Sequence, residues 1–481
     1  MKATSAPALA LFGLLASAVA VAAPAGQVLP PPSDTEQVGV VSNIIYLERC
    51  KNGCTITKGF DDAKTLHSSI PEGAASEYPL DEFQNSQGQT GAAADAEWAA
   101  VVKCVQEIYS PFNVHVTDVK PTNATSYHTN VVAGRATQLG LSSGIGGISP
   151  GVSCNPVDNR VTFTFANTTG GSGMERIYEV CAIAGQESAH TWGLDHAYAY
   201  PDGSSSCNDP MTYRGDCGGQ KFFRNVPMTC GEYTGRPCYC GATQNAHLLL
   251  TAVFGPGTPL TTPPAVTVTL PVPNAMITNG TAVVATASAQ RGVASLELWL
   301  NGYKWGSVKG AKFGPLGQPE SSYSLPIPAD VPDGIIDIVV KAKDDIDITT
   351  ATPPVTVTKG APCATADTCA DGQRCDAGRC LWDPAVGNFG DDCSYPQYCL
   401  SGVCQGTADK TICTQSCVVG VSDACPDASY ECLETSPNKG ICWPKGATDK
   451  TCGGCAASGS DVAPFAFGVF GLALVLRRRR R

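Results

Sequence analysis

The sequence predicts a mixed α+β domain, followed by an all-β sandwich and a small disulfide-rich module. The length of 481 residues allows roughly three domains of ordinary size. The 51 glycines and 35 prolines favour turns and strands over a helical bundle. Of the 24 cysteines, ten and twelve fall in two segments that flank a cysteine-free stretch. So many cysteines indicate an oxidising compartment, where disulfides form.

The N-terminal residues indicate export. Residues 1–22 carry Lys2, an apolar run and small residues suited to cleavage, as in a secretory signal peptide. We therefore expect the protein at the cell surface, in the outer membrane or in the extracellular space. A Pro-rich lead-in at 23–38 is expected to be extended. The net charge of −11 argues against a nucleic-acid partner.

The first predicted domain spans residues 39–255. Apolar residues recur at helical spacing in two segments and alternate at strand spacing in others. In chain order, the predicted elements are a strand in 40–47, a helix in 95–110, strands in 112–116 and 161–165, and a helix through 177–184.

Residues 262–360 contain no cysteine and consist of short strand patterns separated by turn signals such as Asn-Gly and Pro-Asp-Gly. Repeated short strands at this spacing predict a β-sandwich. The segment resembles bacterial immunoglobulin-like modules, a resemblance that implies no chemistry.

Residues 363–442 contain twelve cysteines and few apolar residues. A segment of this kind depends on disulfides because it cannot bury a sufficient core. The spacing C-x5-C-x5-C-x4-C, followed by C-x5-C-x4-C, indicates a short duplicated knot. Pairs of C-x2-C knuckles are absent from the segment, which argues against zinc.

The C-terminal segment, 452–481, begins with Cys452-Gly-Gly-Cys455 and ends with an apolar run and five arginines. The run from Val462 to Leu476 is shorter than the roughly 20 residues of a membrane-spanning helix. The combination resembles the MYXO-CTERM sorting tail of myxobacterial surface proteins. This resemblance implies a sorting protease as partner, and a weak permanent anchor is the alternative.

One stretch, residues 185–198, carries candidate chemistry. On a helix, Gln186 and His190 share a face, and Glu187 lies beside that face, where it is expected to reach solvent. Gly193 is expected to end the helix with a positive φ. The resulting turn would bring His196 back toward the same point.

The pattern Q-E-x-x-H-x-x-G-x-x-H differs by one residue from the metal-binding sequence of the metzincins, H-E-x-x-H-x-x-G-x-x-H. Asp209-Pro-Met-Thr-Tyr213 follows where a metzincin carries its Met-turn. The first domain therefore resembles a metzincin metallopeptidase, which implies an α+β catalytic domain. The stretch from Gly144 to Ile148 resembles the edge strand along which metzincins bind an extended peptide.

The resemblance assigns a role to each motif residue. His190 and His196 would bind one divalent metal, and Glu187 would take a proton from metal-bound water and pass it to the leaving amine. Met211 would pack beneath the metal as a structural residue. Tyr213 would be an extra ligand, a donor to the oxyanion, or a support for the turn.

Gln186 departs from the metzincin pattern and leaves three possibilities. Its amide oxygen would ligate the metal, as the same Q-E-x-x-H form in the gametolysin family of algal matrix proteases implies, with copper as an alternative to zinc. Asp195 would instead supply a carboxylate ligand. In the third case the site is inactive and the domain only binds.

The expected function is that of an exported, metal-dependent endopeptidase, with zinc as the expected metal and copper as the alternative. Its substrate would be an extracellular protein or peptide, and it would contact a membrane only through the C-terminal segment. The rival hypothesis is a catalytically inactive surface adhesion or matrix-binding protein. Both hypotheses accept the same domains, and the carboxylate of Glu187 beside two histidines favours the enzyme.

Overall fold

The computed structural model describes residues 26–28, 41–122, 126–151, 153–311, 320–406, 410–417, 425–436 and 439–445. The predicted signal peptide and sorting segment lie outside the described residues, as does the lead-in apart from 26–28. The chain forms two compact units, Met1–Ala370 with Cys375–Leu381, and Asp371–Arg374 with Trp382–Arg481. None of the described helices has the length and apolar character that crossing a membrane requires.

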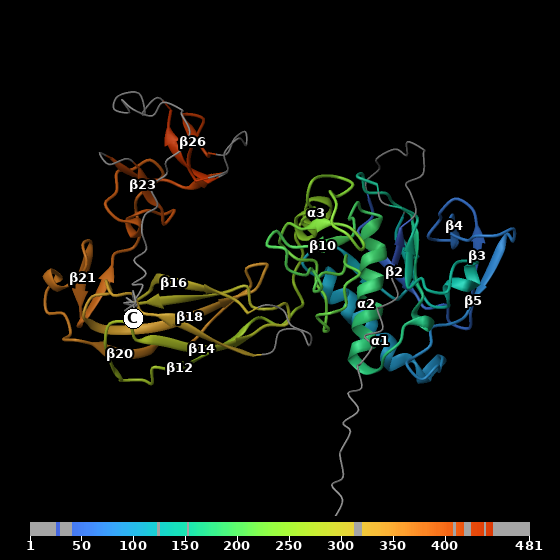
Figure 1. Cartoon of the computed structure of the whole chain (residues 1–481), viewed down its shortest axis with the longest axis horizontal. Coiled ribbons are helices and arrows are strands. Elements are labelled where there is room, and N and C mark those ends of the chain that lie inside the picture. Colours follow the sequence, from blue (N-terminus) through green and yellow to red (C-terminus); the bar gives the residue numbers. More distant parts are fainter. Residues whose placement is uncertain are drawn as a thin grey trace, which may run out of the picture. The chain divides into compact units, whose positions relative to one another are not determined.

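A six-stranded sheet organises the first domain (Figure 1). Its strands in chain order are β1 (Gly26–Val28), β2 (Ile44–Glu48), β6 (His115–Thr117), β7 (His128–Val132), β8 (Gly147–Ser149) and β9 (Val161–Thr164). Their order across the sheet is β1-β8-β9-β7-β2-β6. The last four strands are parallel, whereas β8 is antiparallel to β9. Strand β1 pairs in parallel with β8, so these two strands run opposite to the other four.

Two helices, α1 (Asp95–Tyr109) and α2 (Gly173–His190), pack side by side against one face of this sheet (Figure 1). The helices approach closely at Gly185, where an added Cβ atom would lie 2.5 Å from Cδ1 of Ile108. Glycine at this position therefore allows the C-terminal half of α2 to lie against α1.

The opposite face of the sheet packs against a second sheet of the order β4-β3-β5. Its strands are β3 (Cys54–Lys58), β4 (His67–Ser68) and β5 (Glu77–Leu80). In β2, Ile45 and Leu47 belong to the core under the helices, and Tyr46 belongs to the core on the other side. The central sheet is thus buried on both faces, as expected for mostly parallel strands.

The segment after α2 has little regular structure and is held together by disulfides. The remaining elements of this domain are η1 (Gly91–Ala93), η2 (Ala136–Leu139), η3 (Ala166–Thr168), β10 (Ala197–Ala199), β11 (Thr229–Cys230) and α3 (Ala246–Phe254). The ten cysteines form the pairs 50–54, 104–181, 154–240, 207–217 and 230–238. The prediction of disulfides is therefore confirmed for this domain.

The second domain is all-β, as predicted from its strand spacing. One sheet has the order β12-β14-β17, and the other contains β13-β20-β18-β15-β16 with β19 beside β18. The strands are β12 (Ala265–Leu270), β13 (Met276–Ile277), β14 (Ala282–Ser288), β15 (Ser295–Leu300), β16 (Tyr303–Lys309), β17 (Ser321–Pro326), β18 (Gly334–Lys343), β19 (Thr349–Ala351) and β20 (Val355–Lys359). Alternate residues of β14 and β18 are buried in a single core between the sheets.

A buried charge cluster joins the first domain to the sandwich within the first compact unit. The carboxylate of Asp345 accepts hydrogen bonds of 2.8 and 3.0 Å from the guanidinium of Arg291. It also lies 3.3 Å from Nε of Arg224, a residue of the first domain. Arg224, Arg291 and Asp345 are all nearly inaccessible to solvent.

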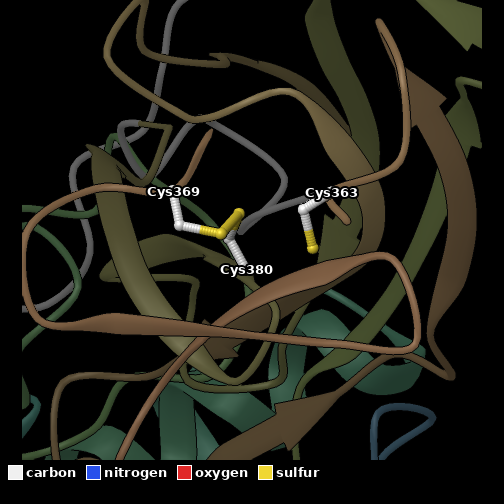
Figure 2. Close-up of side chains that lie close together, drawn as sticks. All are labelled: Cys363, Cys369 and Cys380. Carbon is white, nitrogen blue, oxygen red and sulfur yellow. A yellow bond between two sulfur atoms is a disulfide. The ribbon is translucent and has the colours of Figure 1, made fainter. Parts of the chain in front are cut away.

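Three small knots follow the sandwich, and each is closed by two crossed disulfides. The pairs are 363–375 with 369–380, 393–404 with 399–413, and 417–432 with 425–442. Figure 2 shows the Cys369–Cys380 bond of the first knot beside Cys363. The elements of the knots are η4 (Ala366–Thr368), β21 (Gln373–Asp376), β22 (Arg379–Trp382), η5 (Pro396–Tyr398), β23 (Cys404–Gly406), β24 (Thr411–Cys413), β25 (Ser416–Cys417), β26 (Tyr430–Ser436) and β27 (Lys439–Pro444). The cysteine spacing indicated two copies of the knot, whereas the structure has three. The third copy was missed because its cysteines are spaced further apart.

Candidate metal centre

The motif helix α2 ends at His190, and a sharp turn follows. Gly193 has a φ of +93°, and its amide donates a 3.1 Å hydrogen bond to the carbonyl of His190. A Cβ atom at this position would lie 2.8 Å from the carbonyl oxygen of Ser153. Both the positive φ and the close approach require glycine. The turn returns the chain so that His196 faces His190.

The two imidazoles meet through one nitrogen each. Nε2 of His190 lies 3.1 Å from Nε2 of His196. Nδ1 of His190 lies 2.6 Å from the carbonyl oxygen of Leu194, and Nδ1 of His196 lies 3.0 Å from Oε1 of Glu232. Both partners are acceptors, so each ring carries its proton on Nδ1 when neutral. Burial, assisted by the neighbouring His196, lowers the pKa of His190 well below its ordinary value, which favours this neutral form.

This arrangement fits a divalent cation. If both rings are neutral and protonated at Nδ1, two Nε2 lone pairs lie within 3.1 Å, which is repulsive unless a cation or a proton lies between them. Zinc binds imidazole nitrogen at about 2.0–2.1 Å, which places two such nitrogens roughly 3.3 Å apart in a tetrahedral site. The observed separation of 3.1 Å is close to that value.

Gln186 and Glu187 are also buried at this end of α2, with 3% and 0% of their surfaces exposed. Among the described residues, Nε2 of Gln186 and both carboxylate oxygens of Glu187 have no hydrogen-bond partner. The expectation that Glu187 reaches solvent is therefore wrong, because the side chain lies inside the domain. Burial raises the pKa of Glu187 well above its ordinary value.

Strand β8 lies directly against Glu187. An added Cβ atom at Gly147, within β8, would lie 2.7 Å from Cγ and 2.8 Å from Oε1 of Glu187. The stretch from Gly144 to Ile148, for which we expected an edge strand, overlaps β8 at Gly147 and Ile148. The expectation of an edge is wrong, because β8 pairs with β9 on one side and with β1 on the other. Strand β1 of the lead-in pairs with β8 and also contacts α2.

The predicted Met-turn residues lie near the imidazoles. Met211 is fully buried, and its carbonyl accepts a 2.8 Å hydrogen bond from the amide of Ala197. The ring centroids of Tyr213 and His196 are 4.4 Å apart. Burial is the main cause that raises the pKa of Tyr213, so the phenol stays protonated.

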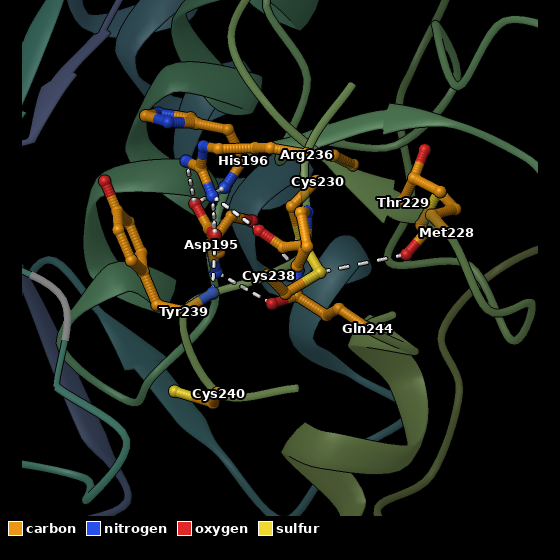
Figure 3. Close-up of a disulfide and its surroundings, with 12 residues drawn as sticks. Asp195, His196, Met228, Thr229, Cys230, Arg236, Cys238, Tyr239, Cys240 and Gln244 are labelled. Atoms are coloured by element: carbon orange, nitrogen blue, oxygen red, sulfur yellow. Dashed lines mark hydrogen bonds and ion pairs between the residues drawn. A yellow bond between two sulfur atoms is a disulfide. The ribbon is translucent and has the colours of Figure 1, made fainter. Parts of the chain in front are cut away.

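Asp195, the alternative ligand, already uses its carboxylate in hydrogen bonds (Figure 3). It accepts hydrogen bonds from Arg236 and from the backbone amides of Tyr239 and His196. The geometry therefore gives no support to Asp195 as a replacement ligand.

Glu232 is the residue that sequence reasoning missed. Its carboxylate accepts from His196, and this hydrogen bond holds the pKa of Glu232 down to about 2. Glu232, Asp195 and His196 form a cluster of candidate ligand atoms. The sequence contains no motif that connects Glu232 to His196. The short spacing between Cys230 and Cys238 indicates only a small loop closed by a disulfide. The other clusters of three candidate ligand atoms among the described residues contain sulfurs of disulfides, as in Figure 2.

Comparison with known proteins gives no assignment by sequence, because the chain matches no protein-family model and no curated protein. Fibronectin(III)-like modules of CbhA from Clostridium thermocellum are 18% identical over 20% of this chain and 94% of theirs, with a TM-score of 0.16. Wild-type OgpA from Akkermansia muciniphila is 12% identical over 57% of this chain and 90% of its own, with a TM-score of 0.18. A lytic polysaccharide monooxygenase from Jonesia denitrificans is 17% identical over 19% of this chain and 60% of its own, with a TM-score of 0.15. None of these similarities is close enough to assign an activity.

Proposed function

We propose that the protein is an exported, metal-dependent endopeptidase of the metzincin type that cleaves extracellular protein. One observation carries the proposal. The Nε2 atoms of His190 and His196 face each other at 3.1 Å while both Nδ1 atoms are bound to acceptors. Two imidazoles fixed in this way have an evident use in binding a cation and no evident use in packing.

His190 and His196 would hold the metal together with the amide oxygen of Gln186. Gln186 precedes His190 by one helical turn and is buried beside it, with its Nε2 unpartnered among the described residues. Zinc is the expected metal and copper the alternative, since imidazole and amide oxygen suit both. When bound, the cation acts as a Lewis acid that polarises a peptide carbonyl and acidifies water.

Glu187 would act as the general base. Its carboxylate oxygens have no competing partner among the described residues, and the side chain is buried beside β8. An oxygen of this carboxylate would accept the proton of the attacking water and return it to the leaving amine. The neutral phenol of Tyr213, next to His196, is the candidate donor to the oxyanion.

The substrate would lie as an extended strand along β8. This strand is antiparallel to β9 and runs beside the end of α2 that carries the motif. Because β1 pairs with β8, the substrate would have to take the place of β1 beside this strand. Pairing with a strand recognises backbone groups and so accepts many sequences. We propose that the C-terminal segment 452–481 serves in sorting or anchoring at the surface.

The test uses the full exported chain with its disulfides intact. We expect bound zinc or copper by elemental analysis, cleavage of denatured protein that a chelator abolishes, and loss of cleavage in Glu187→Gln. Glu175→Gln, at an exposed position in the first turn of the same helix, is the matched control and should cleave normally. Cleavage that persists in Glu187→Gln would refute the enzyme. A folded protein that adheres to matrix but never cleaves would support the rival hypothesis of an inactive adhesion protein.

A further inference from the structure

The loop from Cys230 to Cys238 is closed in two ways. A disulfide joins its ends, and Cys230 and Arg236 exchange backbone hydrogen bonds of 3.1 and 2.7 Å. Gly231 has a φ of +134°, and an added Cβ atom there would lie 1.9 Å from the carbonyl oxygen of Thr234. The backbone of this loop is thus fixed by a covalent bond, a hydrogen-bonded bridge and a glycine that no other residue can replace without a shift.

The loop is attached to the segment that contains His196. Strand β11, which includes Cys230, pairs antiparallel with β10, which begins directly after His196. The amide of Gly231 donates a 2.9 Å hydrogen bond to the carbonyl of His196. This attachment places Glu232 so that its Oε1 atom lies 3.0 Å from Nδ1 of His196.

Arg236 completes a closed ring of hydrogen bonds (Figure 3). Its Nη2 atom donates to Oε1 of Glu232 and to Oδ1 of Asp195, both at 2.8 Å. Oδ1 of Asp195 in turn accepts a 2.7 Å hydrogen bond from the backbone amide of His196. The four residues therefore connect the backbone of His196 to its own side chain through two carboxylates and one guanidinium. The ring carries one net negative charge beside the imidazole.

We propose that Glu232 and Arg236 are positioning residues, and that the Cys230–Cys238 loop is a clamp that holds Nε2 of His196 toward the metal. This inference rests on the proposed metal site. Glu232 fixes the tautomer and the orientation of the ring, and Arg236 fixes Glu232. Carboxylates that orient a metal-binding histidine in this way typically contribute roughly 10- to 100-fold to metal affinity.

The experiment compares zinc dissociation constants of the full chain, measured by competition with a chromophoric chelator. Glu232→Ala is expected to weaken zinc binding roughly 10- to 100-fold. Glu232→Gln retains an acceptor oxygen, so its zinc affinity should fall less than that of Glu232→Ala. A merely structural role would not predict this difference. Glu175→Ala, at an exposed carboxylate on α2, is the control and should bind as the wild type does. The double variant Cys230→Ser with Cys238→Ser should weaken binding in the same direction as Glu232→Ala.

A second measurement separates this inference from the proposed function. In the metal-free protein, ¹⁵N NMR of the imidazoles should report His196 protonated at Nδ1 in the wild type and in Glu232→Gln, and a mixed tautomer in Glu232→Ala. Unchanged zinc affinity and an unchanged tautomer in Glu232→Ala would overturn the clamp while leaving the metal site intact. A wild type that binds no zinc or copper would overturn the proposed function, and the tautomer shift would then still establish that Glu232 positions His196.

Discussion

Tyr109 on α1 and Gly185 on α2 are connected by a buried hydrogen bond of 2.7 Å, in which the tyrosine hydroxyl donates to the glycine carbonyl. Gly185 directly precedes Gln186, so this bond fixes the helix backbone where the proposed metal-binding motif begins. Burial raises the pKa of Tyr109 well above its ordinary value, which keeps the hydroxyl protonated and able to donate.

Tyr109→Phe should lower the free energy of unfolding by about 1–2 kcal/mol, because it removes a buried hydrogen bond without changing the ring. Urea unfolding of the metal-free protein measures this loss. Tyr233→Phe is the matched control, since 76% of the Tyr233 surface is exposed, and it should leave stability unchanged. Equal stability of Tyr109→Phe and the wild type would contradict a structural role for this bond.

Gln186→His should tighten zinc binding, because it replaces an amide oxygen with an imidazole and restores the three-histidine set. The measurement is the zinc dissociation constant by chelator competition, with the copper constant measured in parallel. If zinc affinity stays the same, Gln186 lies outside the coordination sphere and the proposed ligand set is wrong.

Replacing each of residues 26–28 with proline should lower the KM for peptide substrates. Strand β1 pairs with β8, the strand proposed to bind substrate, and proline lacks the amide hydrogen that such pairing needs. The control replaces the same residues with alanine, which keeps the backbone donors, so its KM should remain that of the wild type. Identical KM values for both variants would mean that β1 does not compete with substrate.

The buried His128 predicts acid sensitivity. Its Nε2 atom accepts a 2.9 Å hydrogen bond from Nε1 of Trp192, and the charged groups around it are Asp158 and Arg160. Burial lowers the pKa of His128 from 6.5 to about 4. Between pH 6.5 and about 4, His128 is therefore protonated in the unfolded chain but not in the folded protein. The contribution of neutral His128 to the free energy of unfolding is complete above pH 6.5 and is lost as the pH falls toward 4.

The free energy of unfolding should fall by up to roughly 3 kcal/mol over this pH window, because one pKa unit corresponds to about 1.4 kcal/mol. Urea unfolding at several pH values measures the slope. His128→Gln should flatten the slope, whereas His115→Gln, at an exposed strand position, should leave it unchanged. A slope that persists in His128→Gln would assign the acid sensitivity to another group.

The sequence predicted those parts of the fold and the candidate site that depend on near neighbours in the chain. Periodicity located α1 and α2 but not α3, and it identified the sandwich as all-β without locating every strand. A single glycine located the turn between the two histidines. Strand β7 was missed because Asn130 interrupts its apolar pattern. The side chain of Asn130 is buried and donates hydrogen bonds to the carbonyl of Ala184 and the hydroxyl of Ser188 on α2. These contacts are visible only in the folded chain.

Glu232 was missed for a related reason. It follows His196 by 36 residues, and only the pairing of β10 with β11 brings the two together. The burial of Glu187 was mispredicted because helical spacing places a side chain on a face but does not say what covers that face.

The position of Asp345 has a consequence for how this protein can be divided. Its single carboxylate pairs with the guanidinium groups of Arg224 in the first domain and of Arg291 in the sandwich. A fragment that ends after the first domain would leave Arg224 without the carboxylate of Asp345. The smallest fragment that keeps both ion pairs of Asp345 therefore contains the first domain and the sandwich together. Recombinant fragments should include both domains.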